Sequence, residues 1–190
     1  MNQNNIQTNQ SLWYPPGGIL IWMIVLVEVL TFCMGIGSLV YEKSNDLTNF
    51  SFMQSHLNKT FAFWNTVFLL TSGFCIAVAV LYKSKNNIDV FKVCLTASIL
   101  FGFAFLILKS YEFREKWLLG YTLETSNFFS YYWLLTGFHY LHVVVGILIL
   151  FIIYFSRKTI TFENLEAGAV FWHMCDLIWL LLYPALYLIQ

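Results

Sequence analysis

Five long apolar stretches occupy most of this 190-residue chain, and they constrain its fold more than any other feature. A helix needs about 20 mostly apolar residues to cross a membrane, and each stretch satisfies that length. A membrane β-barrel is excluded, because its strands have about 10 residues and alternate polar with apolar side chains. The predicted spans cover residues 19–41, 61–82, 90–112, 128–155 and 167–189.

Composition and charge indicate a membrane protein and exclude several other classes. Hydrophobic residues make up 59% of the chain and charged residues only 11%, which is unusual for a soluble domain. Ten basic and ten acidic residues give a net charge of zero, and no basic block is present that would bind nucleic acid. The expected fold class is all-α, a polytopic membrane bundle with five transmembrane helices in residues 15–190. Residues 1–14 are predicted to be a disordered polar tail.

The four cysteines, Cys33, Cys75, Cys94 and Cys175, lie in four different apolar stretches. No two of them have the spacing of a zinc site, and their positions do not indicate a disulfide framework. We interpret them as small apolar residues that pack between helices.

Polar residues inside the apolar stretches fall on stripes of the predicted helices. Residues three or four positions apart share one face of a helix, and a charged group at the centre of a membrane helix costs at least about 2.5–3.5 kcal/mol. We therefore expect these stripes to face neighbouring helices, where small and polar residues pack closely. The stripes comprise Glu28, Thr31, Gly35 and Ser38; Asn65 and Ser72; Thr136, His139, Val143 and Gly146; and Glu166, Ala169, His173 and Asp176.

Two carboxylates in these stretches have different expected environments. Glu28 lies about 15 Å along its helix from residue 19, near mid-membrane. Its carboxyl is expected to be neutral or strongly hydrogen-bonded to a neighbouring helix, with proton exchange and contact with lipid or a partner as alternatives. Lys109 and Glu112 are three residues apart, and they are predicted to pair at the membrane boundary with the lysine stem in the membrane edge.

His139, His142 and His173 raise the question of a metal or haem site. Neutral imidazole is the commonest protein ligand of metals, and spacing alone leaves a bis-histidine haem open. A di-iron bundle would need two Glu-x-x-His pairs, and the chain contains none. Interhelical hydrogen bonding is the preferred interpretation of these residues, with proton transfer and contact with lipid headgroups as alternatives.

Two motifs near the carboxyl terminus resemble those of a known family. Residues 136–146 read Thr-Gly-Phe-His-Tyr-Leu-His-Val-Val-Val-Gly, which resembles the Thr-Gly-Phe-His-x-x-His-Val-x-x-Gly motif of haem–copper oxidase subunit III. Residues 166–179 resemble that family's Glu-Ala-Gly-x-x-x-Trp-His-x-x-Asp-x-x-Trp signature. Residues 111–113 and 65–66 resemble its Tyr-Glu-Tyr and Asn-Thr elements. The likeness covers nearly the whole chain from Pro15 onwards.

The resemblance implies a non-catalytic subunit. In this family subunit III carries no haem, copper or other redox centre, and oxygen reduction and proton pumping occur in subunit I. Subunit III packs against subunit I, supports proton uptake, binds phospholipid and protects the enzyme during turnover. The expected partners are therefore oxidase subunits I and II and membrane lipids, and no cofactor or metal is expected on this chain. The residues that the resemblance selects are a polar network of Glu28, Asn65, Glu112, His139, His142, Glu166, His173 and Asp176, and a packing motif of Gly137, Gly146, Trp172 and Trp179.

The resemblance also implies a short form of the family and a location. Larger members have seven helices, whereas this chain matches the last five, as in bacterial terminal oxidases. The lipid-holding cleft of the seven-helix form is therefore not expected as such. The implied location is the bacterial plasma membrane with a cytoplasmic amino terminus, although basic residues are equally numerous on the two sides. Two alternatives remain: an accessory subunit of a nitric-oxide reductase, and an independent transporter or proton channel.

Overall fold

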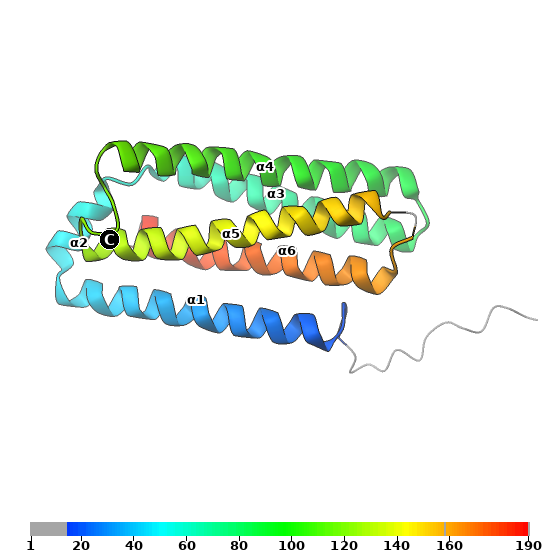
Figure 1. The fold of residues 1–190 in the computed structure, drawn as a ribbon, viewed down its shortest axis with the longest axis horizontal. Helices are drawn as coiled ribbons and strands as arrows, with labels where there is room; N and C mark the ends of the chain where they lie inside the picture. The colour runs from blue at the N-terminus through cyan, green and yellow to red at the C-terminus, as the bar shows by residue number, and fades with distance from the viewer. Residues whose placement is uncertain (1–14, 158, 190) are drawn as a thin grey trace, which may run out of the picture.

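The computed structural model describes residues 15–157 and 159–189, which form helices joined by short turns (Figure 1). A short helix, α2 (Leu47–Ser55), follows the first long helix, and a π-helical turn, η1 (Pro184–Leu188), continues the last one. The described ranges contain no β-strand. The tail predicted for residues 1–14 lies outside them. The long helices are α1 (Ile19–Asn45), α3 (Lys59–Ser84), α4 (Ile88–Leu118), α5 (Asn127–Phe155) and α6 (Phe162–Tyr183).

The five long helices confirm the predicted fold class, because each is long and apolar enough to cross a membrane. The chain is a multi-pass membrane protein. Helix α4 continues to Leu118 although its apolar span was predicted to end at residue 112, and α6 begins at Phe162 although its span was predicted to begin at residue 167. Helix α2 was not predicted, because its nine residues lack a long apolar run. The Asp46 side chain caps α2 by accepting a hydrogen bond from the backbone N–H of Asn49 at 3.2 Å.

The helices form one antiparallel bundle in which α1 lies at the edge and α6 lies inside (Figure 1). Helix α6 contacts α1, α3 and α5, and α4 contacts α3 and α5. In the most apolar window of each helix, 56% of the α6 residues are buried but only 6% of the α1 residues. Helix α1 therefore presents most of its surface to whatever surrounds the bundle.

The two ends of the bundle differ in what they contain. The α3–α4 turn (residues 85–87) and the described residues between α5 and α6 (156, 157 and 159–161) lie at one end, which we call the hairpin end. Helix α2, the start of α5 and the turn η1 lie at the opposite end, which we call the C-terminal end (Figure 1).

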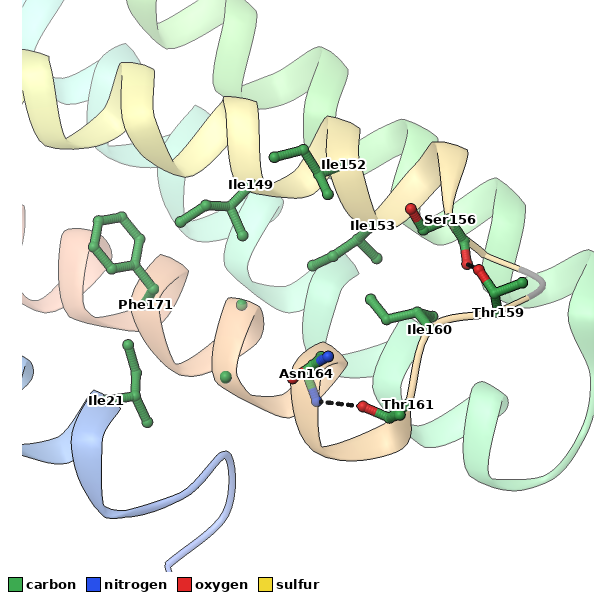
Figure 2. Close-up of a pocket in the computed structure, with 12 residues that line it drawn as sticks. Ile21, Ile149, Ile152, Ile153, Ser156, Thr159, Ile160, Thr161, Asn164 and Phe171 are labelled. Atoms are coloured by element: carbon green, nitrogen blue, oxygen red, sulfur yellow. Dashed lines mark hydrogen bonds between the residues drawn. The ribbon is translucent and has the colours of Figure 1, made fainter.

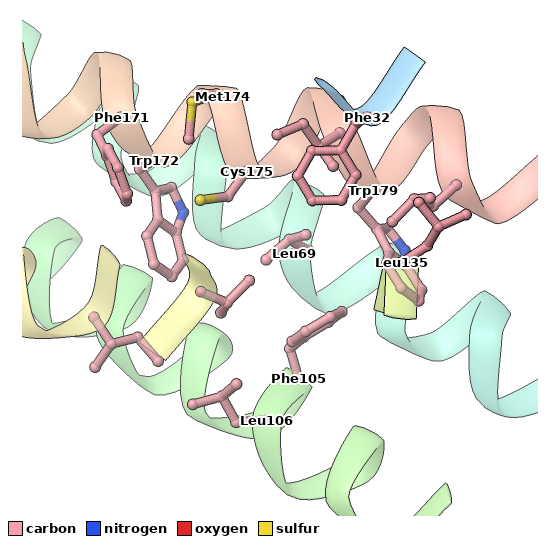
Figure 3. Close-up of a cluster of buried hydrophobic side chains, with 14 of the residues drawn as sticks. Phe32, Leu69, Phe105, Leu106, Leu135, Phe171, Trp172, Met174, Cys175 and Trp179 are labelled. Atoms are coloured by element: carbon pink, nitrogen blue, oxygen red, sulfur yellow. The ribbon is translucent and has the colours of Figure 1, made fainter. Parts of the chain in front are cut away.

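Trp172 lies in the cluster of buried hydrophobic side chains between the helices (Figure 3). Its ring lies against Gly102 of α4 and Gly146 of α5, where an added Cβ would lie 2.8 Å and 2.7 Å from ring atoms. A side chain at either glycine would therefore displace the indole. Gly137 differs, because nothing lies within 4 Å of the position of a Cβ there. The packing role predicted for Gly137 has no counterpart among the described residues.

Candidate functional site

Lys109 and Glu112 of α4 form an ion pair that is completely enclosed by the bundle. The Lys109 Nζ lies 3.1 Å from the Glu112 Oε2, and neither side chain is exposed. Two tyrosines complete the group: Tyr132 of α5 and Tyr187 of η1 donate hydrogen bonds to the Glu112 Oε1 at 2.8 Å and 2.7 Å. The Lys109 Nζ donates to the Tyr187 hydroxyl at 2.8 Å. We call these four residues the Lys109–Glu112 cluster.

Aromatic rings surround the ammonium group of Lys109. Its Nζ lies 4.9–5.4 Å from the ring centroids of Phe113, Tyr132, Trp179 and Tyr187. Rings at this distance attract a cation through their quadrupoles. Together with the hydrogen bonds, they offset the cost of removing two charges from water, which a bare ion pair often does not. The cluster is therefore a satisfied structural group.

The predicted pairing is confirmed, and the pair lies inside the bundle with neither side chain exposed. Helix α4 continues for more than a turn beyond Glu112. Helix α5 and the turn η1 then cover the pair through their tyrosines. Lys109 and both tyrosines were absent from the predicted site residues. The signal that pointed to them was a lysine inside an otherwise apolar run.

A second buried lysine, Lys116, links helix α4 to the residues that follow α2 at the C-terminal end of the bundle. The Lys116 side chain is 2% exposed, and its Nζ donates to the backbone carbonyl of His56 at 2.8 Å. The neighbouring Gln54 amide donates to the carbonyls of Leu186 and Ile189 at 3.0 Å and 2.9 Å. These contacts join α4, α2 and the last residues of the chain. They give the C-terminal end a fixed arrangement around the Lys109–Glu112 cluster.

His139 lies in the bundle interior without the interhelical hydrogen bond that the sequence suggested. Its ring stacks on Trp179 at a centroid distance of 5.3 Å and meets Phe105 edge-on at 5.7 Å. Neither ring nitrogen has a hydrogen-bond partner among the described residues, and the same is true of the Asn65 side chain. The Trp179 indole N–H donates to the Thr66 hydroxyl at 2.9 Å. Packing contacts with neighbouring side chains, and no side-chain hydrogen bonds among the described residues, therefore hold His139 and Asn65 in position.

Glu28 and His142 join α1 to α5. The Glu28 Oε2 lies 3.2 Å from the His142 Nε2, with 24% and 13% of the two side chains exposed. The other ring nitrogen, Nδ1, lies 2.8 Å from the Phe138 carbonyl oxygen. A carbonyl oxygen only accepts hydrogen bonds, so Nδ1 is the donor in this contact. The contact thus brings one acidic and one basic side chain together across the α1–α5 interface.

The α1 stripe only partly follows the prediction. Glu28 and Gly35 are half-buried, whereas Thr31 and Ser38 are exposed. Phe32 and Leu39 are the buried residues of α1, so the face that packs against the bundle is apolar. The Ser38 hydroxyl nevertheless forms a hydrogen bond with the Tyr131 hydroxyl at 2.8 Å.

His173 and Asp176 form a pair on α6, and the histidine side chain is partly exposed on the outside of the bundle. The His173 Nδ1 lies 3.2 Å from the Asp176 Oδ2, and 46% of the histidine side chain is exposed while 9% of the aspartate is. Gly73 of α3 lies opposite, and any Cβ there would collide with the Asp176 carboxylate. Glu166, two turns earlier on α6, is half-buried and forms no bond with the described residues.

Five of the eight predicted polar residues form separate ion pairs, whereas the side chains of Asn65, His139 and Glu166 have no partner among the described residues. The described residues therefore do not form one network. Among the described residues, no group of three or more histidine, cysteine, aspartate or glutamate side chains could hold a metal ion. Each of the four cysteines is free. The geometry supports interhelical and intrahelical pairing as the local role of Glu28, Glu112, His142, His173 and Asp176.

An apolar groove lies between α1, α5 and α6 near the hairpin end (Figure 2). Its volume is about 520 Å³. Isoleucine side chains form much of its wall, and hydroxyl and amide groups occur at the turn between α5 and α6. Such a groove offers no cluster of acids, bases or nucleophiles for chemistry. Its lining residues include Ile21, Ile149, Ile152, Ile153, Ser156, Thr161, Asn164 and Phe171.

The all-helical fold with five apolar helices and a buried ion pair in its interior define a helical-bundle membrane protein. Comparison with known families then identifies it more closely. The family model described as cytochrome c oxidase subunit III matches residues 53–190, which include the whole Lys109–Glu112 cluster. The chain belongs to the cytochrome c oxidase subunit III family.

Individual relatives agree with this assignment. Cytochrome c oxidase subunit 3 of Artemia franciscana is 35% identical over 133 residues, which are 66% of this chain and 49% of the relative. Subunit 3 of the same oxidase from Corynebacterium diphtheriae is 26% identical over 176 residues, covering 88% and 86% of the two chains. Cytochrome bo(3) ubiquinol oxidase subunit 3 of Buchnera aphidicola is 26% identical over 175 residues, covering 88% and 91%. The chain thus spans about half the length of the crustacean relative and most of the two bacterial ones.

Proposed function

We propose that this protein is the non-catalytic, integral-membrane subunit III of a haem–copper terminal oxidase in aerobic electron transport. The observation that carries the proposal is the family match over residues 53–190, together with the bacterial oxidase subunits that align with 88% of the chain. The family match includes the α4, α5 and α6 residues that form the enclosed polar groups.

The geometry of the Lys109–Glu112 cluster supports a structural role. Its charged atoms are paired, and both ionic side chains are completely buried. A substrate would have to break these bonds to reach either group. We place haem and copper in partner subunits, and we propose that phospholipid contacts this chain but that no redox centre resides on it.

The proposed partner that packs against this helical bundle is oxidase subunit I, and subunit II belongs to the same complex. Helix α1 buries little of its surface within the chain, and the His173–Asp176 pair is partly exposed. Polar groups exposed within a membrane span are costly when they face lipid. Contact with a larger subunit would cover such groups, stabilise the complex during turnover and support proton uptake.

The proposed location is the bacterial plasma membrane with a cytoplasmic amino terminus. Support comes from the two bacterial relatives, whose length this chain nearly matches. This orientation places the hairpin end on the cytoplasmic side, where Lys83, Lys85, Lys92 and Arg157 lie in or beside short turns. Basic residues beside short loops favour the cytoplasmic side.

Affinity purification of the tagged full-length chain from native membranes tests this function. We expect a haem-bearing subunit I to co-purify and to show oxidase spectra and oxygen consumption. The chain expressed alone should show no haem absorption. Stoichiometric haem in the isolated chain would contradict the proposal. Co-purification with a nitric-oxide reductase, or proton flux through liposomes holding only this chain, would favour one of the alternative functions.

A further inference from the structure

Two polar side chains in the bundle interior have no hydrogen-bond partner in the described part of the chain. Asn65 of α3 is 0% exposed and His139 of α5 is 1% exposed. The amide atoms of Asn65 and both ring nitrogens of His139 are unpartnered there. Buried polar groups in proteins are nearly always hydrogen-bonded, because taking them out of water without compensation is costly. Both side chains therefore require a partner that the described residues do not supply.

The helix register places Asn65 and His139 at one level of the bundle. The Ser72 hydroxyl of α3 lies 3.0 Å from the Ser98 hydroxyl of α4, so these two residues face each other. Asn65 precedes Ser72 by seven residues and Phe105 follows Ser98 by seven, which is about two turns toward the C-terminal end on each helix. Asn65 and Phe105 therefore share a level, and the Phe105 ring meets the His139 ring edge-on at 5.7 Å.

Trp179 of α6 completes this level of the bundle. Its ring stacks on His139 at a centroid distance of 5.3 Å and meets the Phe105 ring at 5.1 Å (Figure 3). Its indole N–H donates to the hydroxyl of Thr66, the residue that follows Asn65, at 2.9 Å. Four helices thus contribute one residue each to what we call the Asn65–His139 layer: Asn65, Phe105, His139 and Trp179.

The chemistry of the two unpartnered side chains matches water. The Asn65 amide has an acceptor oxygen and two N–H donors, and the His139 ring has at least one N–H donor. Water both donates and accepts, and a buried water molecule bonds to about two to four polar groups. A metal ion matches less well, because the described residues contain no group of three or more side chains that could hold one.

We propose that the Asn65–His139 layer holds ordered internal water, with the Asn65 amide and the His139 imidazole as its hydrogen-bonding partners. The Ser72–Ser98 contact two turns away differs, because there the Ser72 hydroxyl donates to the Ser98 carbonyl at 2.6 Å and the protein satisfies its own polar group. The inference concerns the interior of this chain. It does not depend on the oxidase assignment, so the two can fail separately.

Radiolytic footprinting of the purified full-length chain in detergent, read by mass spectrometry, tests the proposal. An X-ray pulse splits bound water, and the hydroxyl radical oxidises an adjacent aromatic ring that bulk water does not reach. Phe105 is the reporter and Phe129 the reference, because both are 0% exposed and Phe129 packs among other aromatic rings. We expect Phe105 to be oxidised faster than Phe129. Equal rates in the parent protein would overturn the proposal.

Oxygen-18 water added shortly before the pulse separates ordered water from leakage of solvent. Ordered water exchanges slowly, so the oxygen added to Phe105 should contain less of the heavy isotope than the oxygen added to Trp117, which is 65% exposed. The same isotope content at both rings would show that bulk solvent enters the layer, and ordered water would then be ruled out.

The double variant Asn65→Leu with His139→Phe removes both hydrogen-bonding side chains and retains apolar volume. It should lower the oxidation of Phe105 to the level of Phe129. Ser72→Ala is the matched control, because it removes a buried hydroxyl that is bonded to Ser98 on the same pair of helices, and it should leave the rate at Phe105 unchanged. Circular dichroism checks the fold of each variant, and the parent protein alone provides a test if the double variant does not fold. An unchanged rate in a folded double variant, or an equal loss in Ser72→Ala, would contradict the assignment.

Discussion

Lys109 and Glu112 face each other across 3.1 Å in the interior of the bundle, with no part of either side chain exposed. Both belong to α4, but the groups that complete their hydrogen bonds come from α5 and η1. The pair therefore ties three segments of the chain together. Breaking it from one side should cost more than replacing it entirely, because an unpaired buried charge has nowhere to be solvated.

Lys109→Met should lower the free energy of unfolding by about 3–5 kcal/mol, because it leaves the Glu112 carboxylate buried without its cation. The double variant Lys109→Met with Glu112→Leu removes both charges and should be more stable than the single variant. Denaturation of each protein in detergent, followed by circular dichroism, measures the difference. A double variant less stable than Lys109→Met would contradict the expected balance of desolvation and pairing.

Tyr132→Phe and Tyr187→Phe should each destabilise the protein by about 1.5–3 kcal/mol, because each removes a hydrogen bond to a charged group. Tyr140→Phe is the matched control, since among the described residues its hydroxyl bonds only to the Ser110 hydroxyl, in an exposed position. That control should show a smaller loss. Thermal melting of the three variants under one condition checks the ranking, and equal losses would show that burial of the cluster does not strengthen its bonds.

Gly146→Ala should destabilise the bundle by about 1–3 kcal/mol, because the new methyl group overpacks the Trp172 ring. Gly137→Ala on the same helix meets open space and should be neutral or stabilising by up to about 1 kcal/mol, since alanine is the better helix former. The two variants share the same chemical change and differ only in their neighbours. Similar melting temperatures for both would contradict the packing described around Trp172.

His173→Leu should weaken assembly or shorten the turnover lifetime of the complex, while its initial haem spectrum stays unchanged. The substitution removes the partner of the Asp176 Oδ2 and changes a partly exposed polar position to an apolar one. Subunit retention on gel filtration and the decay of oxygen consumption during sustained turnover measure the effect. Loss of the haem spectrum at the start would instead indicate a direct role for this residue at a redox centre.

The sequence by itself determined the five membrane spans and the family motifs. Apolar length is a local property, since a run of about 20 apolar residues is long enough to span a membrane whatever surrounds it. The motifs at residues 136–146 and 166–179 are likewise contiguous, so they can be recognised without a fold. The pairing of Lys109 with Glu112 also followed from spacing, because residues three apart lie on one helix face.

Only the tertiary structure decided where these polar groups lie and what satisfies them. Lys109 and Tyr187 are 78 positions apart in the chain, and no local pattern indicates that they meet. The same holds for Glu28 and His142, which come together because α1 packs along α5. His139 shows the opposite outcome, since its ring is held by Trp179 and Phe105 without the hydrogen bond that its polarity suggested. Hydropathy sets which segments cross the membrane, but the partners of a buried charge depend on how the helices pack.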